Sequence, residues 1–549
     1  MSTNISKAKR EELLKQVAEI RNKLMEHQDE NTNQLLVYLS NIEKDINGKK
    51  YGLVFEEHRE AVDELLENNV PVLIEDESLK IDNGGQQNFL IEGDNLASLK
   101  LLEKTHKGAI DLIYIDPPYN TGNKDFVYDD DFVGEDDKFR HSMWLSFMKK
   151  RLEIMKRLLS KSGVICISID DNEDADLTLL MNELFGERNF IAKITREAIR
   201  GGSKSRFIRN CTDYVLIYAY NVDFVEFSGY KQAAAELTEE DEHGKYLKGR
   251  ELNKWGAGSR REDAPSLWYP IPGPNGEEVY PIRNDGSEGR WRLGKKKMFE
   301  KVEAGDIIFE KRKDGTFIAY EKIRVTTEKI KQFTTLFTEK YLNAKGGERL
   351  KKIFGTMMSV FDYAKPVELI YDLILMCCPK NNAIIFDGFA GSGTTGEATL
   401  QFNKDFNFNN TFILTTNNQN NICKEITYKR LQKVIELEDY KASLKYYKVD
   451  FVPITEQVYY EYADKLLLHI KELVELENGI DFDGNKKVAI CLTDEDFQEF
   501  TSALNDTTTY KAVYVGHDVF ITPEIESKLN SIGIKINIIP DYYYGELRG

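Results

Sequence analysis

The chain has 549 residues, of which 41% are hydrophobic and 30% charged, and its formal net charge is −18. This length predicts about three to four domains, and the composition excludes a disordered, collagenous or membrane-spanning protein. No stretch approaches the ~18 consecutive apolar residues of a membrane span, and the first residues contain no apolar run. We therefore expect a cytoplasmic protein without a removable signal and without a membrane partner.

The N-terminal region is predicted to be helical. Over residues 5–68, apolar side chains such as Leu13, Val17, Ile20 and Leu24 recur at helical spacing. We assign residues 1–85 to a helical N-terminal region.

From about residue 87, short apolar runs alternate with helical stretches. The expected elements are, in order, the strand NFLIEGD, the helix NLASLKLLEKT, the strand DLIYID, the helix SFMKKRLEIMKRLLSKSG closed by Gly163, and the strand VICISID. Such alternation predicts a parallel, doubly wound α/β sheet. We assign residues 86–190 to the first half of this domain.

The alternation stops in residues 191–350, which contain three of the four tryptophans, turn clusters such as WGAGSRRED and β-like runs such as GTFIAYEKIRV. This segment carries 30 Lys and Arg against 25 Asp and Glu, a net of +5, whereas residues 451–549 carry 8 against 18, a net of −10. The overall negative charge therefore does not exclude a polyanionic partner of the middle segment. We expect a mixed domain inserted at 191–350.

The α/β alternation resumes after the insertion, with helices at KPVELIYDLILMCC and TTGEATLQF and strands at NAIIFDGFAG and TFILTT. Residues 351–445 are therefore predicted to be the second half of the split domain. Residues 451–549 are predicted to form a small acidic α/β unit with a role in assembly. The six cysteines are scattered without a metal-ligand spacing, so we expect free thiols, no disulfide framework and no metal site.

The stretch DGFAGSGTTG follows an apolar strand and opens a helix. Its glycines fit G-x-G-x-x-G, and Gly388 and Gly393 also have the spacing of a phosphate-binding loop. A phosphate loop needs a lysine where Thr394 stands, so a nucleoside triphosphate is disfavoured. A dinucleotide site needs an acid about 20 residues on, but TTNNQNN offers none before Glu425. The hypothesis of an NAD site is therefore weakened, although an amide side chain could hydrogen-bond the ribose of NAD.

S-adenosylmethionine is the remaining common ligand of such a loop, because its amino-acid moiety needs close backbone approach and no phosphate cradle. Phe389 could cover the adenosine. The alternative is a tight turn that only packs the helix on the strand. The candidate cofactor residues of this loop are Asp387, Phe389, Gly391, Gly393, Thr394 and Thr395.

The stretch DPPY ends the strand DLIYID with residues suited to holding a planar base that bears an amino group. Asp116 offers carboxylate oxygens at the carboxyl end of the strand, where such sheets bind ligands. Proline fixes φ, so Pro117 and Pro118 hold the chain with the Pro117 carbonyl as a second acceptor. Tyr119 supplies a stacking face. The four residues are the candidate catalytic group, and a plain strand end with a proline turn is the alternative.

DPPYNTG together with FAGSGTT resembles the amino-methyltransferases of DNA, and the target motif precedes the cofactor motif as in their β group. IEGDNLASLKLL, HSMWLSFMKKRL, SGVICISIDDNE and KPVELI extend the resemblance over residues 50–440 to the modification (Mod) subunit of type III restriction-modification systems. The resemblance implies a Rossmann-like methyltransferase sheet in permuted order and adenine-N6 methylation. It also implies a homodimer on double-stranded DNA and a restriction subunit with ATP-dependent translocase and nuclease activity.

Cytosine-N4 methylation, action without a restriction partner, a nucleotide-dependent oxidoreductase and a non-catalytic recognition subunit remain the alternatives. The resemblance also implies roles for single residues. Asp94 and Asn95 would contact the cofactor's adenine, unless GDNL is only a helix N-cap, and Lys365 and Pro366 would close its methionine end. Trp144 and Arg151 are expected to pack, and no residue is assigned to the ribose.

The inserted domain would recognise the target sequence, with basic side chains that contact phosphates and so position the DNA. The alternative for each basic cluster is a solvated, charged loop. The candidate nucleic-acid-binding residues are Lys193, Arg196, Arg200, Lys204, Arg206, Arg209, Arg290, Arg292, Lys295, Lys296 and Lys297.

Overall fold

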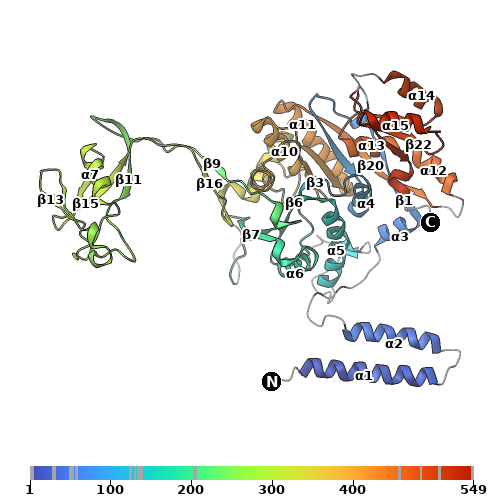
Figure 1. The fold of residues 1–549 in the computed structure, drawn as a ribbon, viewed down its shortest axis with the longest axis horizontal. Helices are drawn as coiled ribbons and strands as arrows, with labels where there is room; N and C mark the ends of the chain where they lie inside the picture. Colours follow the sequence, from blue (N-terminus) through green and yellow to red (C-terminus); the bar gives the residue numbers. More distant parts are fainter. Residues whose placement is uncertain are drawn as a thin grey trace. The chain divides into compact units, whose positions relative to one another are not determined.

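The structure is a computed structural model, drawn in Figure 1. It describes residues 5–545 except for the short segments 27–31, 48–52, 54, 56–59, 123–126, 129–130, 133–139, 202–206, 455–458, 483–484 and 505–508. The chain divides into two compact units, of which the smaller spans Ser228–Phe333 and the larger contains the rest.

A ten-stranded sheet forms the centre of the larger unit, in the order β1-β20-β2-β19-β18-β3-β6-β8-β7-β17. The six strands from β20 to β6 are mutually parallel, whereas β1 and β8 pair antiparallel with their neighbours. The sheet strands are β1 Asn69–Glu75, β2 Gln86–Glu92, β3 Ile110–Ile115, β6 Leu159–Ile169, β7 Phe190–Glu197, β8 Thr212–Ala219, β17 Leu336–Phe337, β18 Ile384–Asp387, β19 Thr411–Thr416 and β20 Ala442–Pro453.

Helices cover both faces of this sheet. Successive strand residues point to opposite faces. In β2, Phe89 and Ile91 belong to one core cluster and Leu90 to another. Helices α4 to α6 join the first cluster, and α8, α10 and α11 join the second. The helices of the larger unit up to the last sheet strand are α1 Ile5–Glu26, α2 Thr32–Asn47, α3 Ala61–Asn68, α4 Asn95–Thr105, α5 Arg140–Leu158, α6 Asp174–Phe185, α8 Asn343–Phe354, α9 Val367–Cys377, α10 Thr394–Phe406 and α11 Lys429–Leu437.

The order of connections reverses between β3 and β18, which are neighbours in the sheet. The chain leaves β3 through α5 on one face to reach β6, and leaves β18 through α10 on the opposite face to reach β19. Ligands of open α/β sheets bind outside the carboxyl ends of the strands at such a switch point. Asp116 follows β3 and Gly388 follows β18, so the two sequence motifs lie on either side of this point.

Two of the expected domain boundaries are wrong. Strand β1 lies within the region expected to be helical, where it pairs with β20 over Asn69–Glu75. Strands β7 and β8, expected in the inserted domain, belong to the large sheet because Val215, Leu216 and Ile217 of β8 are buried against it. The inserted unit is therefore Ser228–Phe333 rather than 191–350.

The helix expected up to Gly163 is also shorter than predicted, because α5 ends at Leu158 and β6 begins at Leu159. Leu159 pairs with Ile110 of β3, and a Cβ at Gly163 would lie 2.9 Å from the Ile110 carbonyl oxygen. Pairing with a buried neighbouring strand therefore overrides the helical preference of these residues.

The smaller unit is built on a four-stranded sheet in the order β10-β11-β15-β14, with a short hairpin formed by β12 and β13 and the strand pair β9 and β16. Trp291, which is fully buried, is central to its core and donates from Nε1 to the Tyr269 carbonyl at 2.7 Å. Its elements are β9 Tyr230–Gln232, β10 Glu239–Asp241, β11 Gly244–Glu251, β12 Ile271–Pro272, β13 Glu278–Val279, α7 Lys295–Glu303, β14 Ile307–Lys311, β15 Phe317–Ile323 and β16 Lys329–Lys331.

The C-terminal segment adds a three-stranded parallel sheet, β21-β22-β23, with its own small core. Residues of α12 and α13 and the C-terminal Tyr543 and Tyr544 join the main core, so this segment belongs to the larger unit. The remaining elements are β4 Val127–Tyr128, β5 Asp131–Phe132, α12 Tyr459–Leu467, α13 Ile470–Asn478, β21 Val488–Cys491, α14 Asp494–Ala503, β22 Ala512–Gly516, α15 Pro523–Ser531, β23 Lys535–Ile539 and α16 Asp541–Tyr544.

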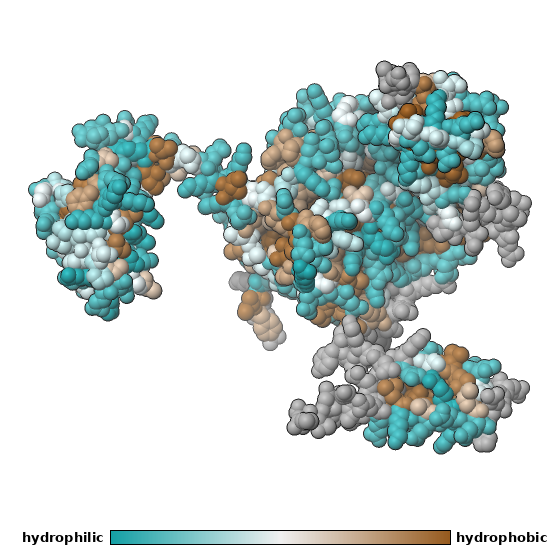
Figure 2. All heavy atoms as spheres, in the orientation of Figure 1, coloured by the Kyte–Doolittle hydropathy of each residue, from teal (hydrophilic) through white to brown (hydrophobic). Residues whose placement is uncertain are grey.

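The helices α1 and α2 bury only a narrow apolar seam, to which Val17 and Leu39 belong, and leave residues such as Val37 and Tyr38 more than half exposed. Figure 2 shows apolar side chains at the surface of these two helices. All six cysteines are free thiols, as expected from the sequence, and five of them are buried. Among the described helices, none is long and apolar enough to cross a membrane.

Candidate active site

The Asp116 carboxylate lies at the carboxyl end of β3 and is held by two other side chains. The Tyr119 hydroxyl donates to Asp116 Oδ1 at 2.9 Å. The Lys365 ammonium donates to Oδ1 at 2.7 Å and to Oδ2 at 2.6 Å. Burial, reinforced by the charge of Asp116, raises the pKa of Tyr119 well above 10, so its hydroxyl stays protonated and donates. These hydrogen bonds orient the carboxylate, which is 27% exposed.

The carbonyl groups of Pro117 and Pro118 differ in their hydrogen bonds. Trp144 of α5, which is fully buried, donates from Nε1 to the Pro118 carbonyl at 2.7 Å. The Pro117 carbonyl, which is the acceptor predicted from the sequence, receives no hydrogen bond from the described residues. Trp144 therefore supports the backbone of the motif, and its expected packing role extends to a hydrogen bond.

The Lys365 side chain contacts Asp116, and its expected role at the methionine end of a cofactor stays a prediction. Its side chain, 7% exposed, ends on Asp116, and its ammonium also lies 4.9 Å from the centre of the Tyr119 ring. Its backbone carbonyl accepts a hydrogen bond of 3.4 Å from Thr394 Oγ1 in the glycine loop. Pro366 follows at the N-cap position of α9. Lys365 thus links the DPPY motif to the glycine loop, a role that the sequence pattern did not indicate.

The glycine loop after β18 needs its glycines for its backbone conformation. Gly391 and Gly393 have φ values of 48° and 79°, in the left-handed region that side chains disfavour. A Cβ at Gly393 would lie 3.0 Å from Thr427 Cγ2. Thr427, in the π-helical segment Ile422–Tyr428, also donates to the Gly391 carbonyl at 2.6 Å. The π-helical turn therefore holds the glycine loop in place through Thr427. Sequence reasoning missed this contact.

A buried ion pair supports the same loop. Arg430, fully buried, donates from Nε to Glu397 at 2.7 Å and from Nη1 to the Ser392 carbonyl at 3.2 Å and Thr394 Oγ1 at 2.8 Å. Glu397, 1% exposed, also accepts from Arg349 at 2.6 Å. Sequence reasoning missed Arg430, because only the fold brings α11 against the loop.

Asp387 ends β18, and its carboxylate is 2% exposed. It accepts hydrogen bonds from the Phe389 amide at 2.9 Å and from the Thr395 hydroxyl. Burial outweighs these hydrogen bonds and raises the pKa of Asp387 from 3.8 to about 7. Phe389 packs against Phe147 of α5, with 6.2 Å between the ring centres.

We expect the substitution Asp387→Asn to change how stability depends on pH. Since the pKa is higher in the folded than in the unfolded state, the folded chain binds more protons between these two values. The contribution of Asp387 is therefore fully present below its unfolded pKa and is lost as pH rises through about 7. The unfolding free energy of wild type minus that of the variant, measured in urea, should fall from about pH 5 to about pH 8. A constant difference would contradict the assignment.

Asp94 in the stretch GDNL is the N-cap of α4. Asp94 accepts hydrogen bonds from the amides of Leu96 at 2.7 Å and Ala97 at 3.3 Å. Asn95 Oδ1 accepts from Arg151 Nε at 2.6 Å, and the buried Arg151 also forms a bidentate pair with Glu60. Capping and packing thus account for these contacts, and a direct role of Asp94 and Asn95 in cofactor binding stays a prediction.

The basic residues predicted to contact DNA fall into three groups. Arg196 is fully buried in a bidentate pair with Asp213 and also bonds the Tyr341 carbonyl, so its assignment to a phosphate contact is wrong. Lys193 pairs with Asp174 and Arg200 with Glu197, at the surface of the larger unit. Lys204 and Arg206 lie outside the described residues, and Arg209 is exposed.

In the smaller unit, Arg290 and Arg292 serve the fold. Arg290 Nε donates to the Gly258 carbonyl at 2.5 Å, and Arg292 Nε donates to the Glu251 carbonyl at 2.9 Å. The side chains of Lys295, Lys296 and Lys297, in the first turn of α7, are exposed. The three lysines therefore form an exposed basic cluster, and their contact with DNA stays a prediction.

Asn120, directly after DPPY, is a further residue that sequence reasoning missed. It is fully buried with a φ of 56°, and its amide donates to Glu173 Oε1 at 2.5 Å and to the Arg140 carbonyl at 3.3 Å. Burial raises the pKa of Glu173 to about 8. Asparagine tolerates left-handed backbone conformations, which is the one local signal that marks this position.

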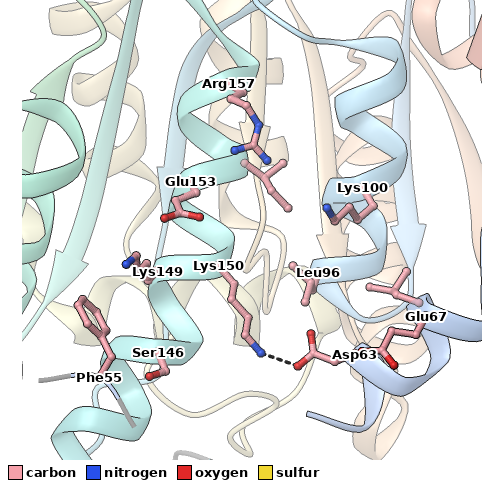
Figure 3. A pocket seen from close by; sticks show the side chains of 12 residues that line it. Phe55, Asp63, Glu67, Leu96, Lys100, Ser146, Lys149, Lys150, Glu153 and Arg157 are labelled. Carbon is pink, nitrogen blue, oxygen red and sulfur yellow. Dashed lines mark hydrogen bonds and ion pairs between the residues drawn. The ribbon is translucent and has the colours of Figure 1, made fainter. Parts of the chain in front are cut away.

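A hollow of about 890 Å³ lies between α3, α4 and α5, and its lining includes the charged residues Asp63, Glu67, Lys100, Lys149, Glu153 and Arg157 (Figure 3). Lys150 and Asp63 form an ion pair at its wall. None of the predicted site residues lines the hollow. The switch point between β3 and β18, where the two motifs meet, is therefore the candidate active site.

Comparison with known proteins agrees with this geometry. The family model described as DNA methylase matches residues 110–429. The Mod subunit of the type III restriction-modification enzyme EcoPI from Escherichia phage P1 is 33% identical over 413 residues, covering 65% of this chain and 63% of that protein. The type II methyltransferase M.KpnI from Klebsiella pneumoniae is 32% identical over 384 residues, covering 66% of this chain and 90% of that protein.

Among solved structures, the cytosine-N4-specific PvuII DNA methyltransferase is similar with a TM-score of 0.33 and 10% sequence identity. The match covers 66% of this chain and 98% of that structure. The chain spans less than two thirds of the length of the EcoPI Mod subunit.

Proposed function

The chain belongs to the DNA methylase family, and we propose that it transfers a methyl group from S-adenosylmethionine to the N6 amine of adenine in double-stranded DNA. The observation that carries the proposal is the meeting of DPPY and the glycine loop at one switch point, joined through Lys365. The catalytic domain is then a permuted Rossmann-like methyltransferase, with the target motif before the cofactor motif and the inserted unit between them.

The residues of the loop after β18 fit S-adenosylmethionine. Gly391 and Gly393, with φ values of 48° and 79°, allow a tight left-handed turn in which backbone can approach a ligand closely. The stretch GSGTTG contains no lysine for a phosphate chain. Asp387 and Phe389 border the same loop. When bound, this cofactor supplies an activated methyl group on a sulfonium, and the protein has only to position an acceptor against it.

The DPPY motif would hold the adenine amino group by two hydrogen bonds, one to Asp116 and one to the Pro117 carbonyl. The amino lone pair is delocalised into the ring, and accepting both N–H protons localises it on nitrogen. Tyr119 and Lys365 each donate to Asp116, so the carboxylate does not need to reorient when the amine arrives. In duplex DNA the adenine must first leave the stack, at a cost of a few kcal/mol.

Analysis of the reaction product tests this proposal. The protein is incubated with DNA and S-adenosylmethionine carrying a labelled methyl group, and the DNA is digested to nucleosides for mass spectrometry. We expect labelled N6-methyldeoxyadenosine. Labelled N4-methyldeoxycytidine would instead support the alternative base, and DNA binding without any labelled nucleoside would support a non-catalytic recognition subunit.

The inserted unit Ser228–Phe333 would read the target sequence. Lysines in the first turn of a helix oppose its macrodipole and cost stability, whereas an anion is favoured there. The exposed Lys295, Lys296 and Lys297 of α7 therefore suit contact with DNA phosphates.

We expect the triple substitution Lys295→Ala, Lys296→Ala and Lys297→Ala to weaken DNA binding without changing S-adenosylmethionine affinity. The slope of log affinity against log salt concentration should become shallower by about 1 for each phosphate that the variant no longer neutralises. Fluorescence anisotropy at several salt concentrations measures both quantities. A control that removes the same charge from the C-terminal segment should leave the slope unchanged, namely Lys511→Ala, Lys528→Ala and Lys535→Ala.

The proposed assembly and partner are those of type III restriction-modification systems. The chain would act in the cytoplasm as a homodimer, with a separate restriction subunit as partner. Light scattering tests the first part, since a dimer has about twice the 63.3 kDa mass of the chain. Copurification with the helicase-like product of a neighbouring gene would test the second, and methylation without such a partner would indicate a stand-alone enzyme.

A further inference from the structure

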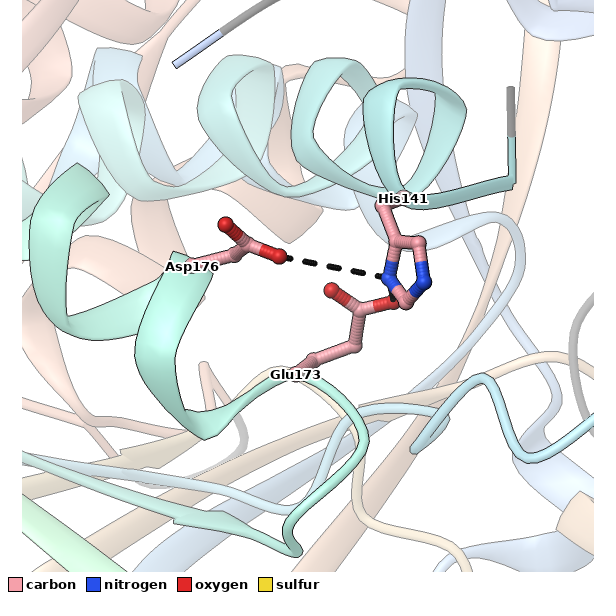
Figure 4. A group of neighbouring side chains, drawn as sticks. All are labelled: His141, Glu173 and Asp176. Carbon is pink, nitrogen blue, oxygen red and sulfur yellow. Dashed lines mark hydrogen bonds and ion pairs between the residues drawn. The ribbon is translucent and has the colours of Figure 1, made fainter. Parts of the chain in front are cut away.

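Three side chains with metal-ligating atoms meet beside the target motif and take no part in the mechanism above (Figure 4). His141 lies in the first turn of α5, Glu173 precedes α6, and Asp176 lies in the first turn of α6. His141 Nδ1 is 2.7 Å from Glu173 Oε1 and 3.9 Å from Asp176 Oδ2. One possible ligand atom from each residue lies within 4.8 Å of the others.

The buried carboxylate of Glu173 is incompletely satisfied. Its side chain is 0% exposed, and Oε2 finds no hydrogen-bond donor among the described residues. Figure 4 shows this second oxygen on the side that faces Asp176, in the space between the three side chains. Asn120 Oδ1, also fully buried, lacks a donor in the same part of the structure, and its amide ends on Glu173. An unpaired buried oxygen is unfavourable, and a bound cation would satisfy it.

We propose that His141, Glu173 and Asp176 bind one divalent transition-metal cation of the Mn²⁺ and Zn²⁺ class. One imidazole with two carboxylates suits these ions, whereas Ca²⁺ and Mg²⁺ prefer oxygen ligands alone. His141 and Asp176 are 45% and 37% exposed, so a cation can enter from solvent.

The neighbouring Arg140 affects how a cation would bind at His141. Arg140 Nε donates to His141 Nε2 at 3.3 Å, which leaves the ring proton on Nδ1, where it points at Glu173. A cation that binds Nδ1 needs the ring proton on Nε2 instead, so cation binding would replace the hydrogen bond from Arg140. The guanidinium of Arg140 opposes the cation, and the two carboxylates outweigh its single charge.

A cation at this place would tie together three segments of the active site. Asn120 is the residue directly after Tyr119, and it bonds both Glu173 and the Arg140 carbonyl at the start of α5. The cation would hold the starts of α5 and α6 to each other and thereby hold Asn120. It would act as a positioning element for the DPPY motif and would not touch the reacting atoms.

Titration of the full chain with Mn²⁺, followed by electron paramagnetic resonance, tests the site directly. We expect one Mn²⁺ per chain, displaced by Zn²⁺, and an affinity at least about tenfold weaker in His141→Ala and in Asp176→Asn. Glu183→Gln is the matched control, because it removes the same charge from α6 roughly 10 Å further along the helix. It should bind Mn²⁺ as wild type does.

Two results would overturn the proposal. One is a spectrum of free Mn²⁺ at millimolar concentration with the wild-type chain. The other is unchanged affinity in both ligand variants, with circular dichroism showing that each is folded. Because metal binding is read without DNA or S-adenosylmethionine, failure of this site and failure of the proposed methylation are distinguishable.

Discussion

Replacing Asp116 by asparagine is expected to lower the rate of methyl transfer by about 10²–10³-fold, the range seen when one preorganised hydrogen-bonding group is removed. Asparagine keeps the shape of the side chain but offers one acceptor oxygen, and its NH₂ group repels both the adenine amine and the Lys365 ammonium. Single-turnover transfer of a labelled methyl group to DNA measures the rate. The affinity for S-adenosylmethionine, measured by calorimetry, should stay the same.

The control is Asp111→Asn at the opposite end of the same strand. Asp111 accepts from Lys380 at 2.6 Å and from the Ile384 amide at 3.0 Å, so this change should affect stability and leave the rate of the folded enzyme near that of wild type. A wild-type rate for Asp116→Asn would show that the carboxylate does not hold the amine.

Lys365→Met separates the orientation of Asp116 from its direct contact with the base. If Lys365 acts only through Asp116, the single substitution lowers the rate, and adding it to Asp116→Asn lowers the rate no further. Independent, additive losses would indicate that Lys365 contacts substrate or cofactor itself. The cycle thereby tests the contact of 2.6–2.7 Å with Asp116 separately from the predicted role of Lys365 at the methionine end.

Replacing Arg430 by methionine is expected to lower the free energy of unfolding by about 3–5 kcal/mol, because it removes the fully buried one of the two arginines that pair with the buried Glu397. The Ser392 carbonyl and the Thr394 hydroxyl lose their donor as well, so the affinity for S-adenosylmethionine should also fall. Denaturant unfolding and calorimetric titration of the folded variant measure the two effects.

The neighbouring Lys429 gives a matched control. Its ammonium is 44% exposed and pairs with Glu425 at the surface, so Lys429→Met should cost less than about 1 kcal/mol. Adding Glu397→Gln to Arg430→Met should recover part of the loss, since the buried carboxylate charge that has lost Arg430 is then removed. Equal costs for Arg430→Met and Lys429→Met would contradict the buried-pair account.

Sequence reasoning was most successful where the signal was local. The strands ending at Ile115 and Asp387, the helix after Asp94 and the glycine turn at Gly391 and Gly393 follow from hydrophobic runs, caps and residue type. It was wrong at residues 159–163 and at Arg196. In both cases a partner distant in the chain, β3 or Asp213, decides the outcome.

The sequence by itself determined the two chemical motifs, the alternation of strands and helices, and the family. A strand end, a proline and a left-handed glycine are recognisable from neighbouring residues alone. Only the tertiary structure decided that Lys365 meets Asp116, that Arg430 supports the glycine loop, and that His141, Glu173 and Asp176 converge beside Asn120. These contacts join residues from different elements, and packing of the sheet between its two helical layers brings them together.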